Sequence, residues 1–559
     1  MLSCKNLSVE TADGKTILAN ANARFAARKM HAVIGPSGCG KTTLMKAMLG
    51  MIPRTGTAKF RGEEIRSSND LAGAIGFVPQ FTLAQQNLTV KETFRYALAL
   101  SISDPSERER RLEAVLNTTK LVAHADKRVG SLSGGQTRRV GLGLELTLNP
   151  QALICDEVTS GLDPNSEDEM LDLLRELVER EHKEIICIIH NLAKLSRFDT
   201  VTVVYRGSLI FQGTYAELLK YFAISNPLRL YDQLESQPLE IWTAMWKRVS
   251  EAHDANSETQ TENPRTAREN ASGRAGFFAQ FLTLISRRFL LFFRDSGYLA
   301  LTLAITFGFP CIVVIFALDG LPQVQRIPID QATMISMQVF EQAIGVQMEN
   351  SRIATLATGL VLFQVMLLAL MGANNGGREI AAERQLYEKE RMTGLRPGAY
   401  ALSKIVFTSL IAIFQGAWMC VFVKIICRFP GDWAPQMLTM TAVCVAMTLI
   451  CLGFSALMQS PEKASLLSIY LVGFQLPLSG IVLELPDSLV WIFRPFINIF
   501  WGWSGFFDAM HESPIYDAYT TMNSNAAIFS FSTSGTVLAL HALLGAALVV
   551  AGCMRKRPL

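Results

Sequence analysis

The sequence has few features of a metalloprotein, a nucleic-acid-binding protein or a secreted protein. Its ten cysteines include no C-x-x-C pair and no spacing typical of zinc ligands, so we interpret them as reduced thiols or small buried side chains. A net charge of +3 over 559 residues gives no electrostatic case for binding nucleic acid. The first ten residues, MLSCKNLSVE, lack the basic and then apolar run of a signal peptide, so we expect the first domain to lie in the cytosol.

Charged residues are scarce in long runs of the second half of the chain, although half of all residues are hydrophobic. We predict six membrane spans, at about 298–318, 353–373, 404–426, 437–458, 464–483 and 534–553. The alternative is a set of buried soluble helices. Lysines and arginines gather between spans two and three and after span six, which by the positive-inside rule predicts that the N- and C-termini are both cytosolic.

The first part of the chain alternates short apolar runs with helical stretches, a pattern typical of an α/β domain with a mostly parallel sheet. We predict this domain, with a helical subdomain, over residues 1–222. A polar linker region at 223–275 and an amphipathic connecting helix at 276–296 follow it. An all-α membrane domain of six spans then covers 297–559. Its segment near 484–533 is apolar but broken by proline and glycine, which favours a re-entrant or interfacial structure outside the six spans.

A glycine-rich loop, GPSGCGKTT, follows the apolar run HAVI and fits the P-loop pattern. In such a loop, backbone N–H groups turn toward phosphates, the lysine reaches the β and γ oxygens, and the first threonine ligates Mg²⁺. The cysteine in the loop is interpreted as a tolerated small side chain, with redox control as the alternative. The predicted ATP-binding residues are Gly35, Pro36, Ser37, Gly38, Cys39, Gly40, Lys41, Thr42 and Thr43.

Two further apolar runs end in residues suited to phosphate chemistry. QALICDE ends in Asp156, predicted to hold Mg²⁺, and in Glu157, predicted to orient the attacking water and accept its proton. EIICIIH ends in His190, which we predict to contact the γ-phosphate; the alternative is a histidine that only completes a strand end. The pattern predicts a site that binds and hydrolyses a nucleoside triphosphate with Mg²⁺.

A second glycine-rich turn, SLSGGQ, offers a hydroxyl and backbone N–H groups at a helix start, which predicts a second anion site through Ser133, Gly134, Gly135 and Gln136. With GPSGCGKT, VPQ, LSGGQ, ALICDE, SGLD and His190 in this order, residues 1–222 resemble the nucleotide-binding domain of ABC transporters. The resemblance implies that Gln80 ligates Mg²⁺ and takes part in catalysis, that Asp163 lies in the D-loop, and that SLSGGQ covers ATP held by another subunit.

The order of the two domains resembles the G subfamily of half-transporters, the White and breast-cancer-resistance-protein type. This resemblance implies a homodimer or a pair with another half-transporter, a coupling helix near 383–392, and a substrate cavity between spans two and five. The candidates for lining that cavity are Phe363, Gln364, Phe474, Gln475 and Ser479; for the glutamines, hydrogen bonding between helices is the alternative. Thr11 stands near the place where many members stack an aromatic ring on adenine, so the sequence does not fix the base.

These features lead us to expect a homodimeric, ATP-driven membrane exporter of lipid-like or amphipathic small molecules, with membrane lipid around it and no nucleic-acid partner. ATP would be hydrolysed at two composite sites between the nucleotide-binding domains. One alternative is a mechanotransmitting or regulatory membrane ATPase that drives a partner protein. An importer is another alternative.

Overall fold

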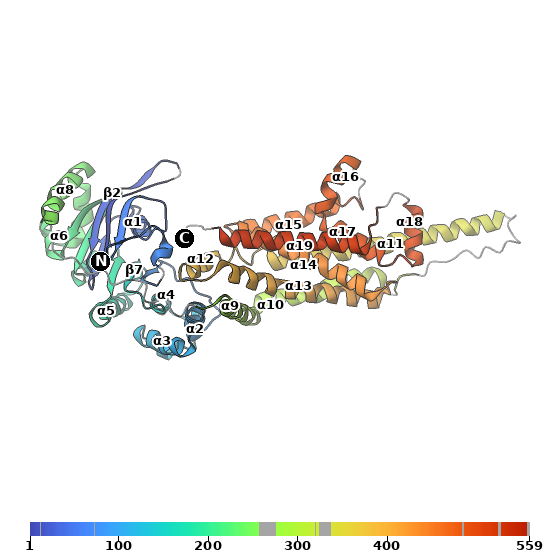
Figure 1. Cartoon of the computed structure of the whole chain (residues 1–559), viewed down its shortest axis with the longest axis horizontal. Coiled ribbons are helices and arrows are strands. Elements are labelled where there is room, and N and C mark those ends of the chain that lie inside the picture. Colours follow the sequence, from blue (N-terminus) through green and yellow to red (C-terminus); the bar gives the residue numbers. More distant parts are fainter. Residues whose placement is uncertain are drawn as a thin grey trace. The chain divides into compact units, whose positions relative to one another are not determined.

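The structure is a computed structural model that describes residues 1–11, 13–71, 73–255, 275–318, 320–322, 337–482, 486–523 and 527–555. The chain forms two compact units (Figure 1). The first unit holds residues 1–283 together with 385–395, and the second unit holds residues 284–384 together with 396–555. A short segment from the second half of the sequence thus belongs to the first unit.

A six-stranded sheet in the order β10-β9-β3-β8-β7-β6 forms the centre of the first unit. All neighbouring strands pair in parallel except β9 and β10. Since the carboxyl ends of parallel strands meet at one edge, the loops that follow β3, β6, β7 and β8 come together there. The strands are β3 (Met30–Ile34), β6 (Ile75–Val78), β7 (Ala152–Asp156), β8 (Glu184–Ile188), β9 (Thr200–Tyr205) and β10 (Ser208–Gly213).

A smaller antiparallel sheet and a group of helices complete the first unit. The sheet has the order β2-β1-β4-β5 and comprises β1 (Leu2–Glu10), β2 (Thr16–Phe25), β4 (Thr55–Phe60) and β5 (Glu63–Glu64). Three helices that pack on one another form the predicted helical subdomain: α2 (Val90–Ser101), α3 (Pro105–Thr118) and α4 (Gly134–Leu146). Helices α1 (Lys41–Met48), α5 (Pro164–Glu181) and α6 (Tyr215–Tyr221) also belong to this unit. The predicted α/β fold is confirmed.

The polar linker predicted from residue 223 is wrong over its first half. Two helices, α7 (Leu230–Glu235) and α8 (Leu239–Ala255), continue the first unit there. They bury Leu230, Leu234 and Trp242 in the core that holds the central sheet, and the Trp242 indole donates a hydrogen bond to the Leu234 carbonyl at 3.2 Å. Because a few apolar residues of α7 and α8 pack on this core, the domain extends to residue 255. Residues 256–274 lie outside the described residues.

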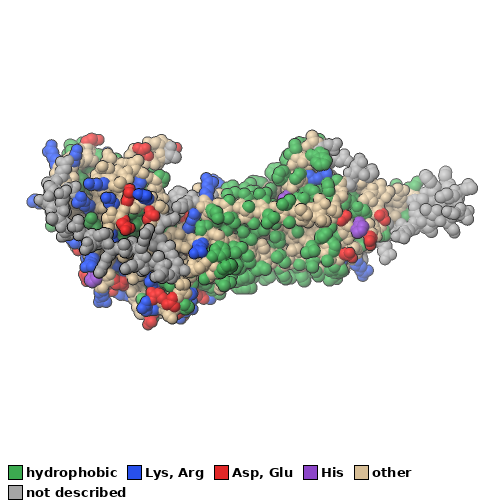
Figure 2. Space-filling view, viewed as in Figure 1, with side chains coloured by type: hydrophobic (Ala, Val, Ile, Leu, Met, Phe, Trp, Pro, Cys, Tyr) green, Lys and Arg blue, Asp and Glu red, His purple; other side chains and the backbone are tan. Residues whose placement is uncertain are grey.

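The second unit is helical, and its exposed face in Figure 2 is largely hydrophobic. Among the described residues, five helices are long and apolar enough to cross a membrane: Ser296–Ala317, Ile344–Gly376, Pro397–Cys427, Trp433–Leu457 and Phe531–Met554. They correspond to α10 (Ser296–Val314) with its 3₁₀ extension, to most of α11 (Met337–Gly376), and to α13 (Pro397–Cys427), α14 (Trp433–Leu457) and α19 (Phe531–Met554). Large exposed apolar side chains such as Leu303, Phe307, Leu410 and Leu543 are those expected of a lipid-facing surface.

The span predicted at 464–483 is the exception among the six. That stretch forms α15 (Pro461–Leu478), which has 18 residues and is not among the five apolar helices. Glu462 and Lys463 in its first turn and Gln475 near its end lower its hydropathy. The described residues therefore support a multi-pass membrane domain with five clear spans and one shorter, more polar helix.

Glycines set the close packing around α14, which lies against α11, α13 and α19. A Cβ added to Gly376 of α11 would lie 2.3 Å from the Thr448 carbonyl oxygen, and one added to Gly545 of α19 would lie 2.4 Å from the Leu449 carbonyl carbon. Both contacts are too short for any side chain. Small residues that let helix backbones approach are the usual basis of helix association in membranes.

A buried ion network joins α9 (Phe277–Arg294), the turn that follows α11, and α13 within the second unit. The Arg288 guanidinium donates to both Glu379 carboxylate oxygens, at 2.5 and 2.6 Å. The Lys404 ammonium lies 2.8 Å from Glu379 and 2.5 Å from Glu383. Burial raises the pKa of Glu379, but the attraction of Arg288 and Lys404 outweighs it and brings that pKa to about 2. Each buried charge has a partner, as burial requires.

The segment near 484–533 holds three short helices, α16 (Asp487–Phe493), α17 (Asn498–Asp508) and α18 (Pro514–Met522). Every residue of α17 from Asn498 to Phe507 is buried, and the helix packs against α11, α14 and α19. The re-entrant or interfacial placement of this segment stays a prediction.

Candidate nucleotide and coupling sites

The P-loop joins the end of β3 to the start of α1 and depends on glycine at three positions. Gly38 and Gly40 have φ values of 76° and 101°, in the left-handed region that glycine adopts without strain. A Cβ added at Gly35 would lie 2.0 Å from the Val204 carbonyl oxygen of β9. The predicted loop therefore has the tight backbone that a phosphate cradle requires.

Lys41 is buried at the start of α1, where its ammonium donates hydrogen bonds to the carbonyls of Gly35 at 2.8 Å and Pro36 at 3.0 Å. The Lys41 side chain thus folds back over the P-loop, at which it is predicted to contact the phosphates. Cys39 is also buried, and burial raises the pKa of its thiol. A raised pKa lowers the thiolate fraction, which favours the interpretation of Cys39 as a small structural side chain.

Sequence reasoning missed Tyr231 of α7, whose hydroxyl donates a hydrogen bond to the same Gly35 carbonyl at 3.2 Å. If Lys41 turns to phosphate as predicted, Tyr231 would still donate to this carbonyl. Position alone brings Tyr231 there, because α7 follows α6 and a 3₁₀ turn after the last strand and packs on the core that holds the sheet. No motif in the sequence points to it.

We expect Tyr231→Phe to weaken nucleotide binding by about fivefold, the loss of one hydrogen bond of about 1 kcal/mol. Tyr221→Phe is the matched control, because the buried Tyr221 hydroxyl has no hydrogen-bond partner in the described part of the chain. Titration of a fluorescent ADP analogue against the full chain measures both. Equal affinities for the two variants would contradict a role of Tyr231 in the bound state.

His31 of β3 adds a pH dependence to the strand that carries the P-loop. Its ring lies 2.6 Å from the Thr200 hydroxyl and 2.9 Å from the Ala26 carbonyl, and burial lowers the pKa of His31 to about 4. An unfolded histidine titrates near pH 6.5. Between these values the unfolded chain binds a proton that the folded chain does not.

We therefore expect the free energy of unfolding of the first unit to fall by about 2 kcal/mol through His31 as the pH falls from above 7 to about 5. Thermal unfolding of the full chain at both pH values, wild type beside His31→Gln, measures this. The variant should lose less stability than the wild type over the same range. An identical loss would show that His31 titrates normally.

Two of the three predicted metal ligands, Thr42 and Asp156, meet at the sheet edge, whereas Gln80 bonds to Glu157. The Thr42 hydroxyl donates to the Asp156 carboxylate at 3.1 Å. Burial raises the pKa of Asp156, and the hydrogen bond from Thr42 opposes this rise. Two adjacent oxygen donors beside a phosphate loop fit Mg²⁺, which keeps waters and substrate phosphates as its other ligands. Mg²⁺ bound there by Thr42 and Asp156 would neutralise phosphate charge.

Glu157 lies between Gln80 and His190. The Gln80 amide donates to one Glu157 carboxylate oxygen at 2.8 Å, and the His190 Nε2 lies 2.5 Å from the other. Glu157 has a φ of 52°, an uncommon conformation for a residue other than glycine, of the kind that often occurs at functional sites. The sequence reasoning missed Arg138 of α4. Burial lowers the pKa of Arg138, and the attraction of the Glu157 carboxylate opposes that lowering. Three residues predicted from three separate strand ends thus form one cluster.

The signature turn belongs to the start of α4. The Ser133 hydroxyl accepts the Gln136 backbone N–H at 3.3 Å, and the side-chain Oε1 of Gln136 accepts the Ser133 backbone N–H at 3.1 Å. Gly134 faces open space, whereas a Cβ on Gly135 would lie 3.3 Å from the Ser166 hydroxyl. None of the described hydrogen bonds of Ser133 or Gln136 goes to the P-loop.

The predicted D-loop residue, Asp163, begins α5. Its carboxylate accepts the N–H groups of Asn165 at 3.1 Å and Ser166 at 3.0 Å. A hydrogen bond from the Ser166 side chain, and after it the bonds from the backbone N–H groups of Ser166 and Asn165, lower the pKa of Asp163. The signature turn and the D-loop therefore adjoin at Ser166.

Comparison with known proteins matches both parts of the chain to transporter families. Residues 18–160 match the family "ABC transporter", and residues 279–533 match "ABC-2 type transporter". The chain belongs to the ABC transporters. The ATPase domain precedes the membrane domain, which is the domain order of the G subfamily. Relatives from that subfamily match as well, so this chain is a G-type half-transporter.

Three relatives illustrate the match. The transporter is 26% identical over 505 residues to the ABC transporter ATP-binding/permease protein Rv1747 of Mycobacterium tuberculosis, covering 86% of this chain and 55% of that protein. It is 32% identical over 242 residues to ATP-binding cassette sub-family G member 5 of Mus musculus, covering 40% and 37% respectively. It is 33% identical over 220 residues to ABC transporter G family member 22 of Arabidopsis thaliana, covering 37% and 29%. The chain spans about half or less of the length of these curated relatives.

The helix of the transporter predicted to couple its two domains is α12 (Arg384–Met392), and residues 385–395 belong to the first unit. Its Lys389 ammonium pairs with the buried Glu145 carboxylate of α4 at 2.9 Å. The other oxygen of Glu145 accepts the Phe77 N–H of β6 at 3.2 Å. One rigid helix, roughly 20 Å long, thus carries the signature turn at one end and holds α12 at the other.

The start of α9 also contacts this region. Gln280 is buried, and its amide donates to the Leu100 carbonyl at the end of α2 at 2.8 Å and to the Gly394 carbonyl after α12 at 3.1 Å. The predicted connecting helix therefore bonds directly to the segment around the predicted coupling helix.

We expect Lys389→Met and Glu145→Gln each to destabilise the docked α12 by about 3 kcal/mol. The first variant leaves the Glu145 carboxylate without its partner, and the second leaves the Lys389 ammonium without its partner. The double variant should cost at least about 1 kcal/mol less than the two single variants together. Hydrogen exchange of residues 385–395 in the full chain measures the opening of α12. Strict additivity would contradict a direct pair.

The residues predicted to line a substrate cavity differ in burial and in hydrogen bonding within this chain. Gln364 donates to the Met419 carbonyl at 3.5 Å, Gln475 accepts the Ile499 N–H at 3.1 Å, and Ser479 donates to the Leu476 carbonyl at 2.7 Å; all three are buried. These bonds are of the kind that the alternative interpretation of the glutamines describes, and the place of the five residues in a substrate cavity stays a prediction. Phe474 is exposed, and the half-buried Phe363 packs edge-on against Phe316.

Proposed function

We propose that two copies of this transporter form an ATP-driven exporter with both termini in the cytosol. The observation that carries the proposal is the Glu157 cluster, in which a carboxylate has hydrogen-bond partners in Gln80 and His190 beside the Thr42–Asp156 pair. A carboxylate so placed can accept a proton from a water that attacks the γ-phosphate. A regulatory protein with degraded sites would not keep all these groups together.

We propose a second copy because the signature turn is exposed and the described hydrogen bonds of Ser133 and Gln136 do not go to the P-loop of the same chain. Gly134 has no atom within 4 Å of an added Cβ, so its backbone N–H can be approached closely. A helix N-terminus with open N–H groups suits the γ-phosphate of ATP bound to a partner. In a symmetric pair, each copy then completes the other's site.

Closure of such sites would reach the membrane domain through α4. The Glu145–Lys389 ion pair and the Gln280 bonds make α12 and the start of α9 follow movements of the first unit. A rigid-body movement of this kind is the usual way in which a small change at a ligand site is transmitted. We propose that it switches the membrane domains between inward-open and outward-open states.

The proposed cargo is a lipid-like or amphipathic small molecule. It is supported by the apolar membrane domain and by Phe474, whose ring is 64% exposed on α15, a helix of that domain. ATP hydrolysis by the full chain in lipid nanodiscs, across sterols, phospholipids and amphipathic drugs, tests it. Stimulation by one ligand class supports the proposal, whereas turnover that no ligand alters would favour an ATPase that drives a partner protein.

A further inference from the structure

The residue after His190 fastens the loop that carries this histidine to α5. Asn191 is the N-cap of the 3₁₀ helix η4 (Leu192–Arg197), and its side-chain carbonyl oxygen accepts the Ala193 N–H at 3.1 Å. The side-chain amide of Asn191 donates to the Glu167 carboxylate of α5 at 2.8 Å. One side chain therefore caps η4 and joins its start to α5.

Glu167 is a firm anchor because it is buried. It is 9% exposed and lies one helical turn after Asp163, the N-cap of α5. A buried carboxylate requires hydrogen-bond donors that stay in place. A hydrogen bond to an ionised group is also stronger than one between neutral groups. The bond from Asn191 therefore restricts both side chains.

Two ion pairs continue the contact between η4 and α5 farther along both helices. The Lys194 ammonium lies 2.6 Å from Asp168, and the Arg197 guanidinium lies 2.8 Å from Asp172. All four side chains are partly exposed. Exposed ion pairs contribute little to stability. These two pairs therefore fix η4 less firmly than the buried bond at its start.

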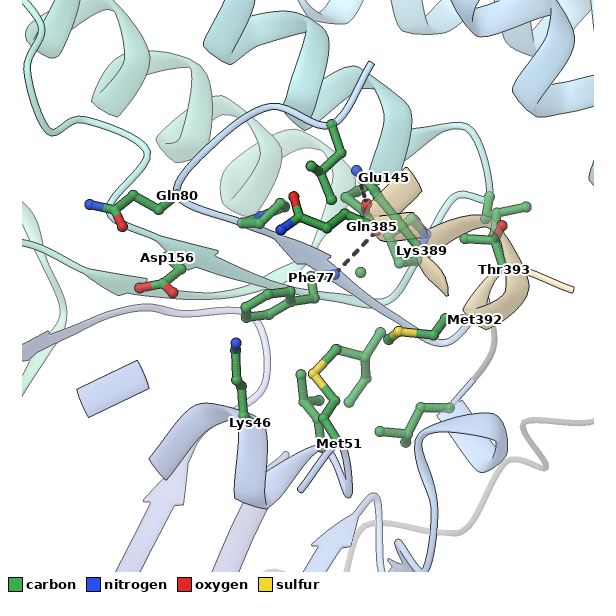
Figure 3. A pocket seen from close by; sticks show the side chains of 18 of the residues that line it. Lys46, Met51, Phe77, Gln80, Glu145, Asp156, Gln385, Lys389, Met392 and Thr393 are labelled. Carbon is green, nitrogen blue, oxygen red and sulfur yellow. Dashed lines mark hydrogen bonds and ion pairs between the residues drawn. The ribbon is translucent and has the colours of Figure 1, made fainter. Parts of the chain in front are cut away.

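His190 needs a fixed position for the Glu157 cluster to form. Its Nε2 lies 2.5 Å from the Glu157 carboxylate, at the edge of the sheet where Gln80 and Asp156 also lie (Figure 3). The His190 side chain is 38% exposed, so packing around the ring does not fix it. A displacement of about 1 Å can cost on the order of 100-fold in rate. The backbone on either side of the ring must therefore hold it.

We propose, resting on the catalytic role proposed above for Glu157 and His190, that Asn191 is a positioning residue for His190. It acts through its hydrogen bond to Glu167. When this bond is lost, the start of η4 moves away from α5 and His190 moves with it. Nucleotide still binds, since no residue of the P-loop takes part in the bond. Loss of the bond therefore lowers kcat and leaves the KM for MgATP nearly unchanged.

Exchanging the two partners tests the bond in the full chain in nanodiscs. Asn191→Asp can still accept the Ala193 N–H, but it places a second carboxylate against Glu167, and like charges repel. We expect kcat to fall by at least about tenfold, with the KM for MgATP within about twofold of the wild type. Adding Glu167→Gln restores one donor and one acceptor in reversed order. The double variant should recover kcat to within about threefold of the wild type.

Lys194→Met is the matched control, because it removes an exposed ion pair between the same two helices. Its kcat should stay within about twofold of the wild type. Asn191→Ser keeps a cap for η4 but is too short to reach Glu167, and it serves if Asn191→Asp does not fold; its kcat should fall as well. Binding of a fluorescent ADP analogue checks the folding of each variant.

Wild-type kcat in Asn191→Asp would overturn the role of Asn191. A loss that Glu167→Gln does not restore would also overturn it, because the defect would then not arise from this bond. An equal loss in Lys194→Met would contradict a specific role. Glu157→Gln, assayed beside these variants, separates the two proposals. Turnover retained there contradicts Glu157 as the base, and the rates of Asn191→Asp and the double variant still decide the role of Asn191.

Discussion

Glu157→Gln should lower ATP turnover by at least about 100-fold, the usual contribution of a general base, and leave nucleotide binding intact. The substitution removes the proton acceptor and little else. Glutamine has nearly the same shape, and its carbonyl oxygen can still accept the Gln80 amide that lies 2.8 Å from the carboxylate. Phosphate release by the purified chain and binding of a fluorescent ATP analogue measure the two properties.

The control for this experiment is Glu169→Gln, at an exposed carboxylate of α5 that pairs with Arg139 on the surface. It should turn over ATP at the wild-type rate. Turnover that persists in Glu157→Gln would show that another group accepts the proton. The cluster around Gln80 and His190 would then have only a structural role.

The second large effect is expected at Gly134. The structure leaves room for a side chain there, so Gly134→Asp should fold normally, and its carboxylate would lie at the N-terminus of α4, where negative charge is tolerated. In the proposed dimer, however, that carboxylate would face the γ-phosphate held by the partner. Juxtaposed like charges cost several kcal/mol, so turnover should fall by about 100-fold or more.

Gly134→Asn is the matched control, with the same size and no charge. It should keep at least about tenfold more activity than Gly134→Asp if repulsion is the cause. Initial rates at saturating MgATP compare the two. If Asn and Asp variants were equally inactive, steric exclusion and not charge would explain the loss; if both were fully active, the signature turn would not approach a phosphate.

The nucleotide site was predictable because its residues follow buried strands. Asp156, Glu157 and His190 end apolar runs that form β7 and β8, and parallel strands bring such ends to one edge of the sheet. Lys41 and Thr42 follow β3 in the same way. Local pattern and spacing therefore determined these positions without knowledge of any long-range contact.

Residues that act through tertiary contacts were not predictable. Tyr231 reaches the P-loop from 196 positions away, and Glu145 meets Lys389 only because α12 packs on the first unit. The polar composition after residue 222 also concealed α7 and α8, whose burial rests on a few side chains such as Leu234 and Trp242. Short amphipathic helices of this kind carry a weak periodic signal.

In the membrane domain, hydropathy predicted the helices but not the direction of their polar side chains. Gln475 was a candidate for a cavity wall, yet it accepts the backbone N–H of Ile499 at the start of α17. Gln415 likewise joins the Asn375 amide at 2.7 Å and the Thr306 hydroxyl at 3.0 Å. A buried amide in an apolar bundle finds a partner within the bundle, and only the packing shows which one.

The most direct test of composite sites is to mix copies of two defective chains. Lys41→Met removes the P-loop lysine and leaves the signature turn intact, whereas Gly134→Asp does the reverse. A mixed dimer, purified through a different tag on each copy, contains one site with both elements intact. We predict that it hydrolyses ATP well above either parent preparation. A mixed dimer no more active than its parents would contradict the account, because the two elements would not then be supplied by different copies.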